Sequence, residues 1–86
     1  MIKVSFKASF VREWKRLPAE QQDEVYEKIE LLKHTKNHKL LKVHKLHGRM
    51  KKYYAFSVDY RTRVLFEYFA KNEVLLLGIG DHDLYK

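Results

Sequence analysis

The sequence predicts a two-layer α+β domain of order β-α-α-β-β-β, in which a helical hairpin lies on one face of a mostly antiparallel sheet. Two observations predict this fold class. Apolar residues recur at helical spacing between residues 10 and 32, and aromatic and β-branched runs bounded by turn-forming residues follow from residue 50 onward. At 86 residues with 45% hydrophobic content, the chain can form one packed core, and we expect a single domain over residues 1–86.

The N-terminal part is expected to contain one strand and two helices. Residues 2–6, IKVSF, alternate apolar and polar side chains as a half-buried strand does. An apolar stripe at helical spacing then indicates a first helix: Phe10, Val11, Trp14 and Leu17. Pro18 ends this helix and suits the first turn of the next one. The second helix has its apolar positions at Val25, Ile29 and Leu32.

Three further segments are expected to form an antiparallel meander: residues 50–58, 60–69 and 73–80. In the middle strand, one face is apolar and should lie under the helices, with Val64, Phe66 and Tyr68. The other face carries Arg61, Arg63, Leu65 and Glu67. We therefore expect one open, basic sheet face, which would be the working surface of the protein.

The composition excludes several classes of protein. There is no cysteine, so neither a disulfide framework nor a cysteine-based zinc site is possible, which fits a reducing compartment. The first ten residues lack the apolar run of a secretory signal, and no apolar run approaches the roughly 20 residues that span a bilayer. We expect a cytoplasmic protein with no membrane partner.

The net charge of +7 is concentrated in one part of the chain. Residues 31–58 hold eight Lys/Arg and no acid, whereas residues 1–30 are balanced and residues 59–86 carry a net charge of −1. Such clustering favours a nucleic-acid partner, with a solvated lysine-rich surface as the alternative. Tyrosines that follow the basic run can stack on unpaired RNA bases or, alternatively, pack in the core. The predicted nucleic-acid-binding residues are Lys36, Lys39, Lys42, Lys45, Arg49, Lys51, Lys52, Tyr53 and Tyr54.

The same segment contains histidines at spacings that could bind a metal. His34 and His38 are four residues apart, and His44 and His47 are three apart. A divalent cation there would meet about eight positive charges and no carboxylate, which disfavours binding. We expect no metal and no other cofactor.

The C-terminal residues GDHDLYK suggest acid–base chemistry. His82 lies between two acids that stabilise its protonated form, and Tyr85 is three residues further on. Cleavage of RNA requires a base for the 2′-hydroxyl, an acid for the leaving 5′-oxygen and a cation beside the phosphorane. His82, Tyr85 and either Arg63 or Arg61 could supply these roles, although a histidine near a terminus is more often without a catalytic role.

The whole chain resembles the RelE/ParE superfamily of toxins from bacterial type II toxin–antitoxin systems. The resemblance rests on the order of four segments: FVREWKRLP, KLHG, DYRTRVLFEY and LLLGIGDHDLYK. It implies a ribosome-dependent mRNA endonuclease that contacts rRNA and mRNA and is held inactive by a cognate antitoxin. It also implies that Arg63 stabilises charge on the phosphate, that His82 is an acid or base as in some members, and that Tyr85 is the terminal aromatic.

The sequence departs from the family at one catalytic feature. Two strand lysines that are implicated in catalysis in the family align with Tyr54 and Phe56. The resemblance therefore leaves the base open among His82, His47, Lys51 and Lys52. Two other functions remain as alternatives: inhibition of DNA gyrase by binding, as in the ParE branch, and a catalytically inactive family member.

Overall fold

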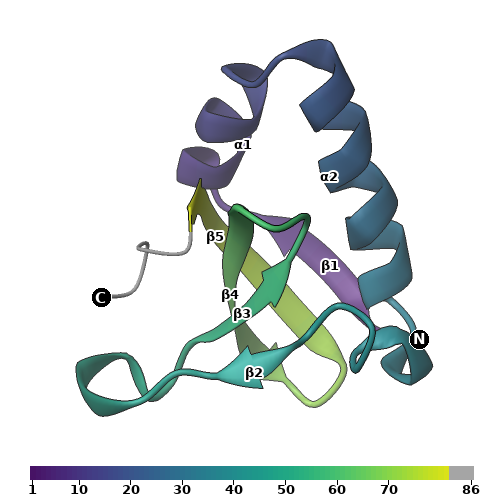
Figure 1. Ribbon diagram of the computed structural model, residues 1–86. Coiled ribbons are helices and arrows are strands. Elements are labelled where there is room, and N and C mark those ends of the chain that lie inside the picture. The colour runs from purple at the N-terminus through teal and green to yellow at the C-terminus, as the bar shows by residue number, and fades with distance from the viewer. Residues whose placement is uncertain (82–86) are drawn as a thin grey trace.

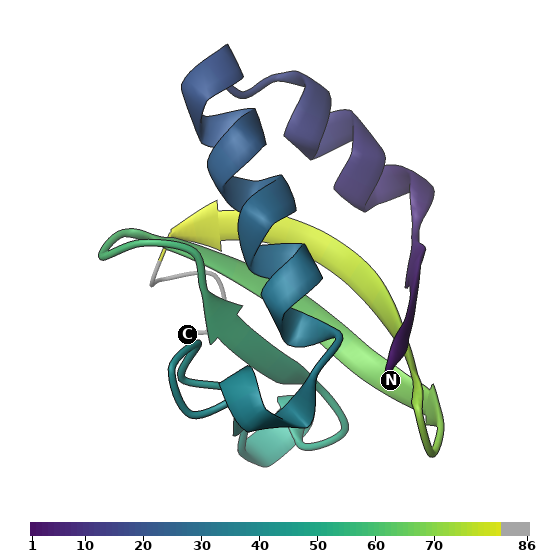
Figure 2. The ribbon, with the colours of Figure 1, turned by 90° about the vertical axis from the view of Figure 1, so that its right-hand side faces the viewer.

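The computed structural model describes residues 1–81. Two helices lie on the same side of a five-stranded sheet (Figures 1 and 2). This two-layer arrangement confirms the predicted α+β fold class. No helix in this part of the chain is both long and apolar enough to cross a membrane.

The N-terminal elements are β1 (Lys3–Phe6), α1 (Ala8–Lys15) and α2 (Ala19–Leu32). Pro18 directly precedes α2 as its N-cap residue, with a φ of −57°, whereas α1 already ends at Lys15, before the proline. Two hydrogen bonds tie the helices together. Trp14 Nε1 donates to the Gln22 carbonyl at 3.2 Å, and the Gln22 side-chain amide donates to the Trp14 carbonyl at 3.1 Å.

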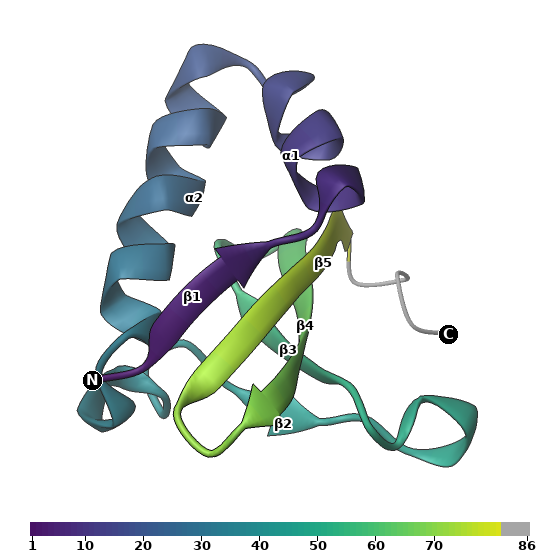
Figure 3. The same cartoon turned by 180° about the vertical axis from the view of Figure 1, so that it is seen from behind.

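The sheet also contains β2 (His44–Lys45), β3 (Tyr54–Ser57), β4 (Thr62–Ala70) and β5 (Glu73–Asp81). The strand order is β1-β5-β4-β3-β2 (Figure 3). The β1–β5 pair is parallel, and the other neighbours are antiparallel. The three predicted C-terminal strands are thus confirmed. However, β3 begins four residues later than expected and β4 two residues later, so Arg61 belongs to the turn before β4.

Strand β2 was not predicted; it lies between two short 3-10 helices, η1 (Thr35–Asn37) and η2 (Gly48–Met50). Its two residues are polar and exposed, so they have no alternating pattern. The strand exists because its backbone pairs with β3, with His44 opposite Ala55 and Lys45 opposite Tyr54. Tertiary pairing, and not local propensity, determines this edge strand.

The core lies between the helices and the sheet. On α2, the predicted apolar stripe is buried, with Val25, Ile29 and Leu32. On β4, Val64 and Phe66 are fully buried and Tyr68 packs against them, as the alternation predicts. Two side chains that follow α2 satisfy carbonyl groups at its C-terminal end. Asn37 Nδ2 donates to the Leu31 carbonyl at 3.0 Å, and His38 Nε2 lies 2.8 Å from the Leu32 carbonyl.

Candidate active site

Arg63 lies on β4 opposite Ser57 of β3 and Gly80 of β5. Because its neighbour Val64 points into the core, Arg63 belongs to the sheet face away from the helices. Its guanidinium Nη1 donates to three main-chain carbonyls, those of Asp59 at 2.8 Å, Tyr60 at 3.1 Å and Thr62 at 3.3 Å. The group is therefore held beside the β3–β4 turn. Its Nε and Nη2 face no hydrogen-bond acceptor within residues 1–81 and can bind an oxyanion.

The β3–β4 turn is itself fixed by Asp59. Its Oδ1 accepts hydrogen bonds from the backbone amides of Arg61 at 2.8 Å and Thr62 at 2.7 Å. Burial, the largest single influence, raises the pKa of Asp59. Hydrogen bonds from the amides of Thr62 and Arg61, from the Thr62 side chain and from Glu24 together lower it by more, so the net pKa falls below the ordinary value. An ionised Asp59 thus holds the turn whose carbonyls hold Arg63. The second predicted arginine, Arg61, is exposed in this turn.

Glu24 extends from α2 toward the same turn. Burial raises the pKa of Glu24, and a hydrogen bond and the negative charge of Asp59 raise it further. One of its carboxyl oxygens, Oε1, is shielded from solvent. The two carboxyl groups therefore have pKa values that shift in opposite directions, and together they connect α2 to the turn.

The basic segment, residues 33–52, runs from the end of α2 around edge strand β2, and its last part, which contains η2, projects beyond the sheet (Figure 1). Seven of its cations are exposed: Lys36, Lys39, Lys42, Lys45, Arg49, Lys51 and Lys52. Within residues 1–81, none of these seven forms an ion pair, whereas Lys33 pairs with Glu30 at 2.7 Å. Their charge is thus available to a polyanion.

The two adjacent tyrosines have different surroundings. The Tyr54 ring stacks on Phe66 at 5.6 Å between centroids and meets the edge of Tyr68 at 5.0 Å. It packs against the core, so the structure favours core packing for this predicted base-stacking residue. Tyr53 precedes the strand and is half-buried, with Lys52 Nζ 5.2 Å from its ring centroid. Of the two rings, Tyr53 is the better candidate for contact with RNA.

The histidines of the basic segment also separate into different roles. His38 belongs to the cap of α2, while His34 and His47 are exposed. No group of three potential metal-ligating side chains occurs within residues 1–81.

His44 emerges from the structure as a residue that the sequence analysis considered only as a metal ligand. It is opposite Ala55, which is two residues from Ser57, the partner of Arg63. Residues opposite one another share a face, so His44 and Arg63 lie on the same side of the sheet, separated laterally by two strand spacings, roughly 10 Å. Its Nδ1 lies 2.9 Å from the Lys42 carbonyl. The alternation of side chains on β3 could have placed His44 on the same face as Arg63, but only if the pairing of β2 with β3 had been known.

The end of β5 is fixed by α1. Ser9 Oγ donates to the Leu77 carbonyl at 2.6 Å, and Glu13 Oε1 accepts from the Ile79 amide at 2.8 Å. The β4–β5 register shifts at this point, and a Cβ on Gly78 would lie 3.0 Å from Glu13 Oε1. Glycine at position 78 thus permits the close approach of the Glu13 carboxyl group. His82 and Tyr85 lie outside the described residues.

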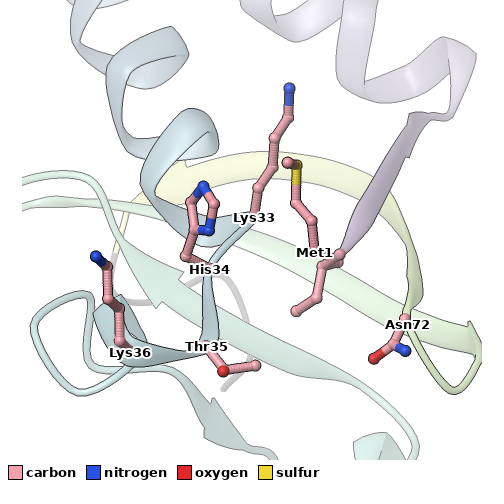
Figure 4. Close-up of a pocket in the computed structure, with 7 residues that line it drawn as sticks. Met1, Lys33, His34, Thr35, Lys36 and Asn72 are labelled. Carbon is pink, nitrogen blue, oxygen red and sulfur yellow. The ribbon is translucent and has the colours of Figure 1, made fainter.

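A depression lies at the end of the sheet that is opposite to the β3–β4 turn. It has a volume of about 360 Å³ and is lined by residues that include Met1, Lys33, His34, Lys36 and Asn72 (Figure 4). Asn72 lies in the β4–β5 turn, nine residues beyond Arg63 along β4. This corresponds to roughly 25–30 Å along the strand, so the depression cannot share a substrate atom with Arg63.

Comparisons with known proteins identify the fold. No protein-family model matches the chain, and no curated protein matches its sequence. Among solved structures, a YoeB/ParE toxin from Agrobacterium tumefaciens superposes with a TM-score of 0.75 at 19% identity, covering 94% of this chain and 99% of that one. YafQ from E. coli gives a TM-score of 0.76 at 14% identity, with both chains covered completely. The archaeal RelE–RelB complex from Pyrococcus horikoshii gives 0.73 at 16% identity, covering 96% and 97% of the chains.

Other similar structures are complexes as well, including a heterotetrameric YoeB–YefM toxin–antitoxin complex from Staphylococcus aureus. The agreement extends over nearly the whole length of each chain, with β1, both helices and the sheet included. The resemblance drawn from the sequence is therefore confirmed at the level of the fold, and this chain has the fold of the RelE/ParE toxin superfamily.

Proposed function

We propose that this protein is the toxin of a toxin–antitoxin pair and that it cleaves mRNA on the ribosome. The observation that carries the proposal is Arg63, a guanidinium fixed by three carbonyls beside the β3–β4 turn. Around the same sheet, seven exposed cations lack ion-pair partners within residues 1–81. A fixed cation among phosphate-binding charges is what phosphoryl chemistry on a polyanion requires. The toxin names of proteins with this fold support the same class.

The proposed reaction is an internal transfer at the phosphate. The 2′-oxygen attacks the adjacent phosphorus, the bond from phosphorus to the 5′-oxygen breaks, and a cyclic 2′,3′-phosphate and a 5′-hydroxyl form. A base takes the proton of the 2′-hydroxyl and an acid returns one to the 5′-oxygen. Arg63 stabilises the additional negative charge on the phosphorane, and no metal is required.

The proton-transfer roles are assigned to side chains that can exchange a proton. His82 and Tyr85 are proposed from the family resemblance. The base comes from the set His82, His47, Lys51 and Lys52, to which the shared face with Arg63 adds His44. Arg61, exposed in the turn, is a secondary cation. Each role is tested separately by substitution.

A translation extract programmed with a defined message tests the activity, with new 5′ ends mapped by primer extension. We expect cuts in codons that occupy the ribosomal A site. Arg63→Ala should abolish them, whereas Arg61→Ala, a matched exposed arginine two residues away, should reduce them less. His82→Ala should also abolish cutting while the circular dichroism spectrum is unchanged. If Arg63→Ala cuts normally, Arg63 does not stabilise the phosphorane and the proposal loses its main support.

A protein that cuts mRNA in the cytoplasm needs an inhibitor, so we propose a cognate antitoxin as a partner. The exposed cations predict that an acidic or amphipathic segment of this antitoxin lies against the basic segment. Co-expression with an acidic reading frame from beside the gene should give a stable complex that does not cleave mRNA. A complex whose affinity is unchanged between low and high salt would contradict this mode of binding.

The same experiments address gyrase inhibition, the function of the ParE branch. No new 5′ ends, together with blocked supercoiling by purified gyrase, would replace the nuclease proposal with inhibition by binding. Neither effect would indicate an inactive family member.

A further inference from the structure

A cleft of about 440 Å³ opens beside Arg63, between α2, residues 40–42 and the β3–β4 turn. Its apolar lining comprises Leu31, Leu41 and Val58, and its cationic lining comprises Lys28, Lys42 and Arg63. Two large side chains at its border are strongly exposed, Tyr60 at 89% and Leu40 at 72%. The volume corresponds to that of small-ligand sites, and the lining combines apolar surface with positive charge.

Lys42 has an unusual backbone conformation at this cleft. Its φ is +56°, and no other non-glycine residue among those described has a positive φ. A lysine in this left-handed region costs about 1 kcal/mol relative to glycine. The surrounding hydrogen bonds hold it there, since the Lys42 amide donates to the Lys39 carbonyl at 3.1 Å and the Lys42 carbonyl lies 2.9 Å from His44 Nδ1. This position carries a long cationic side chain, although glycine or asparagine would fit the backbone conformation better.

Tyr60 combines exposure with a fixed backbone. It lies in the turn that Asp59 holds through the two following amides, and its own carbonyl accepts from Arg63 Nη1 at 3.1 Å. An aromatic ring that is 89% exposed gains nothing from core packing. A ring on a rigid turn can, however, stack on an unpaired base with little loss of conformational entropy.

The charges around the cleft favour an anion. Asp59 lines it too, but its Oδ1 is engaged by two backbone amides. Lys28 lies at 3.8 Å from Glu27, at the limit of an ion pair, and Glu24 on the same helix faces Asp59. Lys42 and the Nε and Nη2 atoms of Arg63 have no acidic partner within residues 1–81. A phosphate therefore fits between Lys42 and Arg63.

We propose that this cleft binds one nucleotide of single-stranded RNA, with its base on Tyr60 and its phosphate between Lys42 and Arg63. The inference rests on the proposed function, because the phosphate between Lys42 and Arg63 is the one that is to be cleaved, and the cleft holds a nucleotide attached to it. It adds Tyr60 and Lys28 to the RNA-binding residues and assigns Lys42 a specific role. An acidic peptide of a partner protein is the competing occupant, and the experiment separates the two.

The test uses the full chain and a four-nucleotide single-stranded RNA that carries a 2′-O-methyl group at each position, so that it cannot be cleaved. Binding is followed by fluorescence anisotropy and by amide NMR spectra. Lys42→Asn is the main variant, since asparagine tolerates a positive φ and folding is preserved. Its matched control is Lys71→Asn, an exposed lysine in the β4–β5 turn. Tyr60→Ala is matched with Tyr26→Ala, an α2 tyrosine that is 61% exposed.

We expect Tyr60→Ala to weaken binding roughly 5- to 150-fold, as loss of one stacked base does. Lys42→Asn should weaken it several-fold and lower the slope of log affinity against log salt by about 0.7. The two controls should bind as the parent protein does, and RNA should shift the amide signals of the turn around Tyr60.

Three results would overturn the inference. Equal binding by Lys42→Asn and Lys71→Asn, with shifts confined to residues 44–53, would place the RNA elsewhere while the proposed nuclease function remained intact. Shifts at Tyr60 caused by an acidic peptide but not by RNA would assign the cleft to a protein partner. No RNA binding together with no cleavage on ribosomes would reject the proposed function and the nucleotide site at once.

Discussion

The contact between Glu13 and the end of β5 makes a prediction that can be measured by a double-mutant cycle. Glu13 Oε1 accepts the Ile79 amide at 2.8 Å and also lies 3.0 Å from the position of a Cβ on Gly78. A methyl group at Gly78 would therefore push on the same oxygen that binds the Ile79 amide. The two substitutions Glu13→Ala and Gly78→Ala should not have additive effects.

The structure sets the size of each effect. Glu13→Ala removes a hydrogen bond to a charged acceptor and leaves a part-buried amide without a partner, which should cost about 2 kcal/mol. Gly78→Ala gains up to about 1 kcal/mol from restriction of the unfolded chain but stretches the Glu13 bond, for a net loss of about 1 kcal/mol. Without the glutamate the methyl group has room. The double variant should thus lose about 1.5 kcal/mol, roughly half of the additive value.

Urea unfolding of the four proteins, followed by circular dichroism, gives the free energies. For a domain of this size, 2 kcal/mol corresponds to a fall in Tm of roughly 10 °C. Glu13→Gln serves as the control, since its side-chain oxygen can still accept the amide and most of the stability should remain. Effects that add to within about 0.5 kcal/mol would refute the argument that one oxygen governs both positions.

Three further predictions concern the turn and the end of α2. Asp59→Ala should lower the free energy of unfolding by about 1 kcal/mol and weaken the proposed RNA cleavage. Asp59→Asn keeps the acceptor for both amides and should retain the stability at neutral pH. Equal loss of stability in both variants would show that these two hydrogen bonds do not hold the turn. Because the pKa of Glu24 is raised on folding, its stabilising contribution is complete below the ordinary glutamate pKa and is lost as pH rises through the folded value. Glu24→Gln should therefore be more stable than the parent at pH 7.5 and lose this advantage near pH 4 in thermal unfolding. His38→Ala should cost about 1 kcal/mol and speed amide hydrogen exchange in the last turn of α2; unchanged exchange would show that the ring does not cap Leu32.

Periodicity predicted the elements whose side chains alternate between core and solvent. The spacing of Val25, Ile29 and Leu32 identified the buried stripe of α2, and the alternation on β4 assigned Val64 and Phe66 to the core. These patterns are local, since each residue's environment follows from its position on its own helix or strand.

Features that depend on a second segment could not be predicted in this way. No local pattern in the sequence indicates that β2 pairs with β3. Nor does one indicate that Arg63 Nη1 donates to the carbonyls of Asp59 and Tyr60. Tyr54 shows the limit most simply. Alternation required that Tyr53 and Tyr54 point in different directions, but the aromatic partners Phe66 and Tyr68 decided which one packs against the core.

The position of β5 inside the sheet has a consequence for when the protein can fold. β5 lies between β1 and β4, and its parallel pairing joins residues 3–6 to residues 73–76. A nascent chain that has not yet released β5 from the ribosome lacks the strand that connects its first segment to the rest of the sheet, and it also lacks the backbone that Ser9 and Glu13 bind. Closing this long loop is a late and slow step in folding. The fold therefore delays assembly of the Arg63 face until synthesis has passed β5, so a growing chain does not yet present that face to a binding partner.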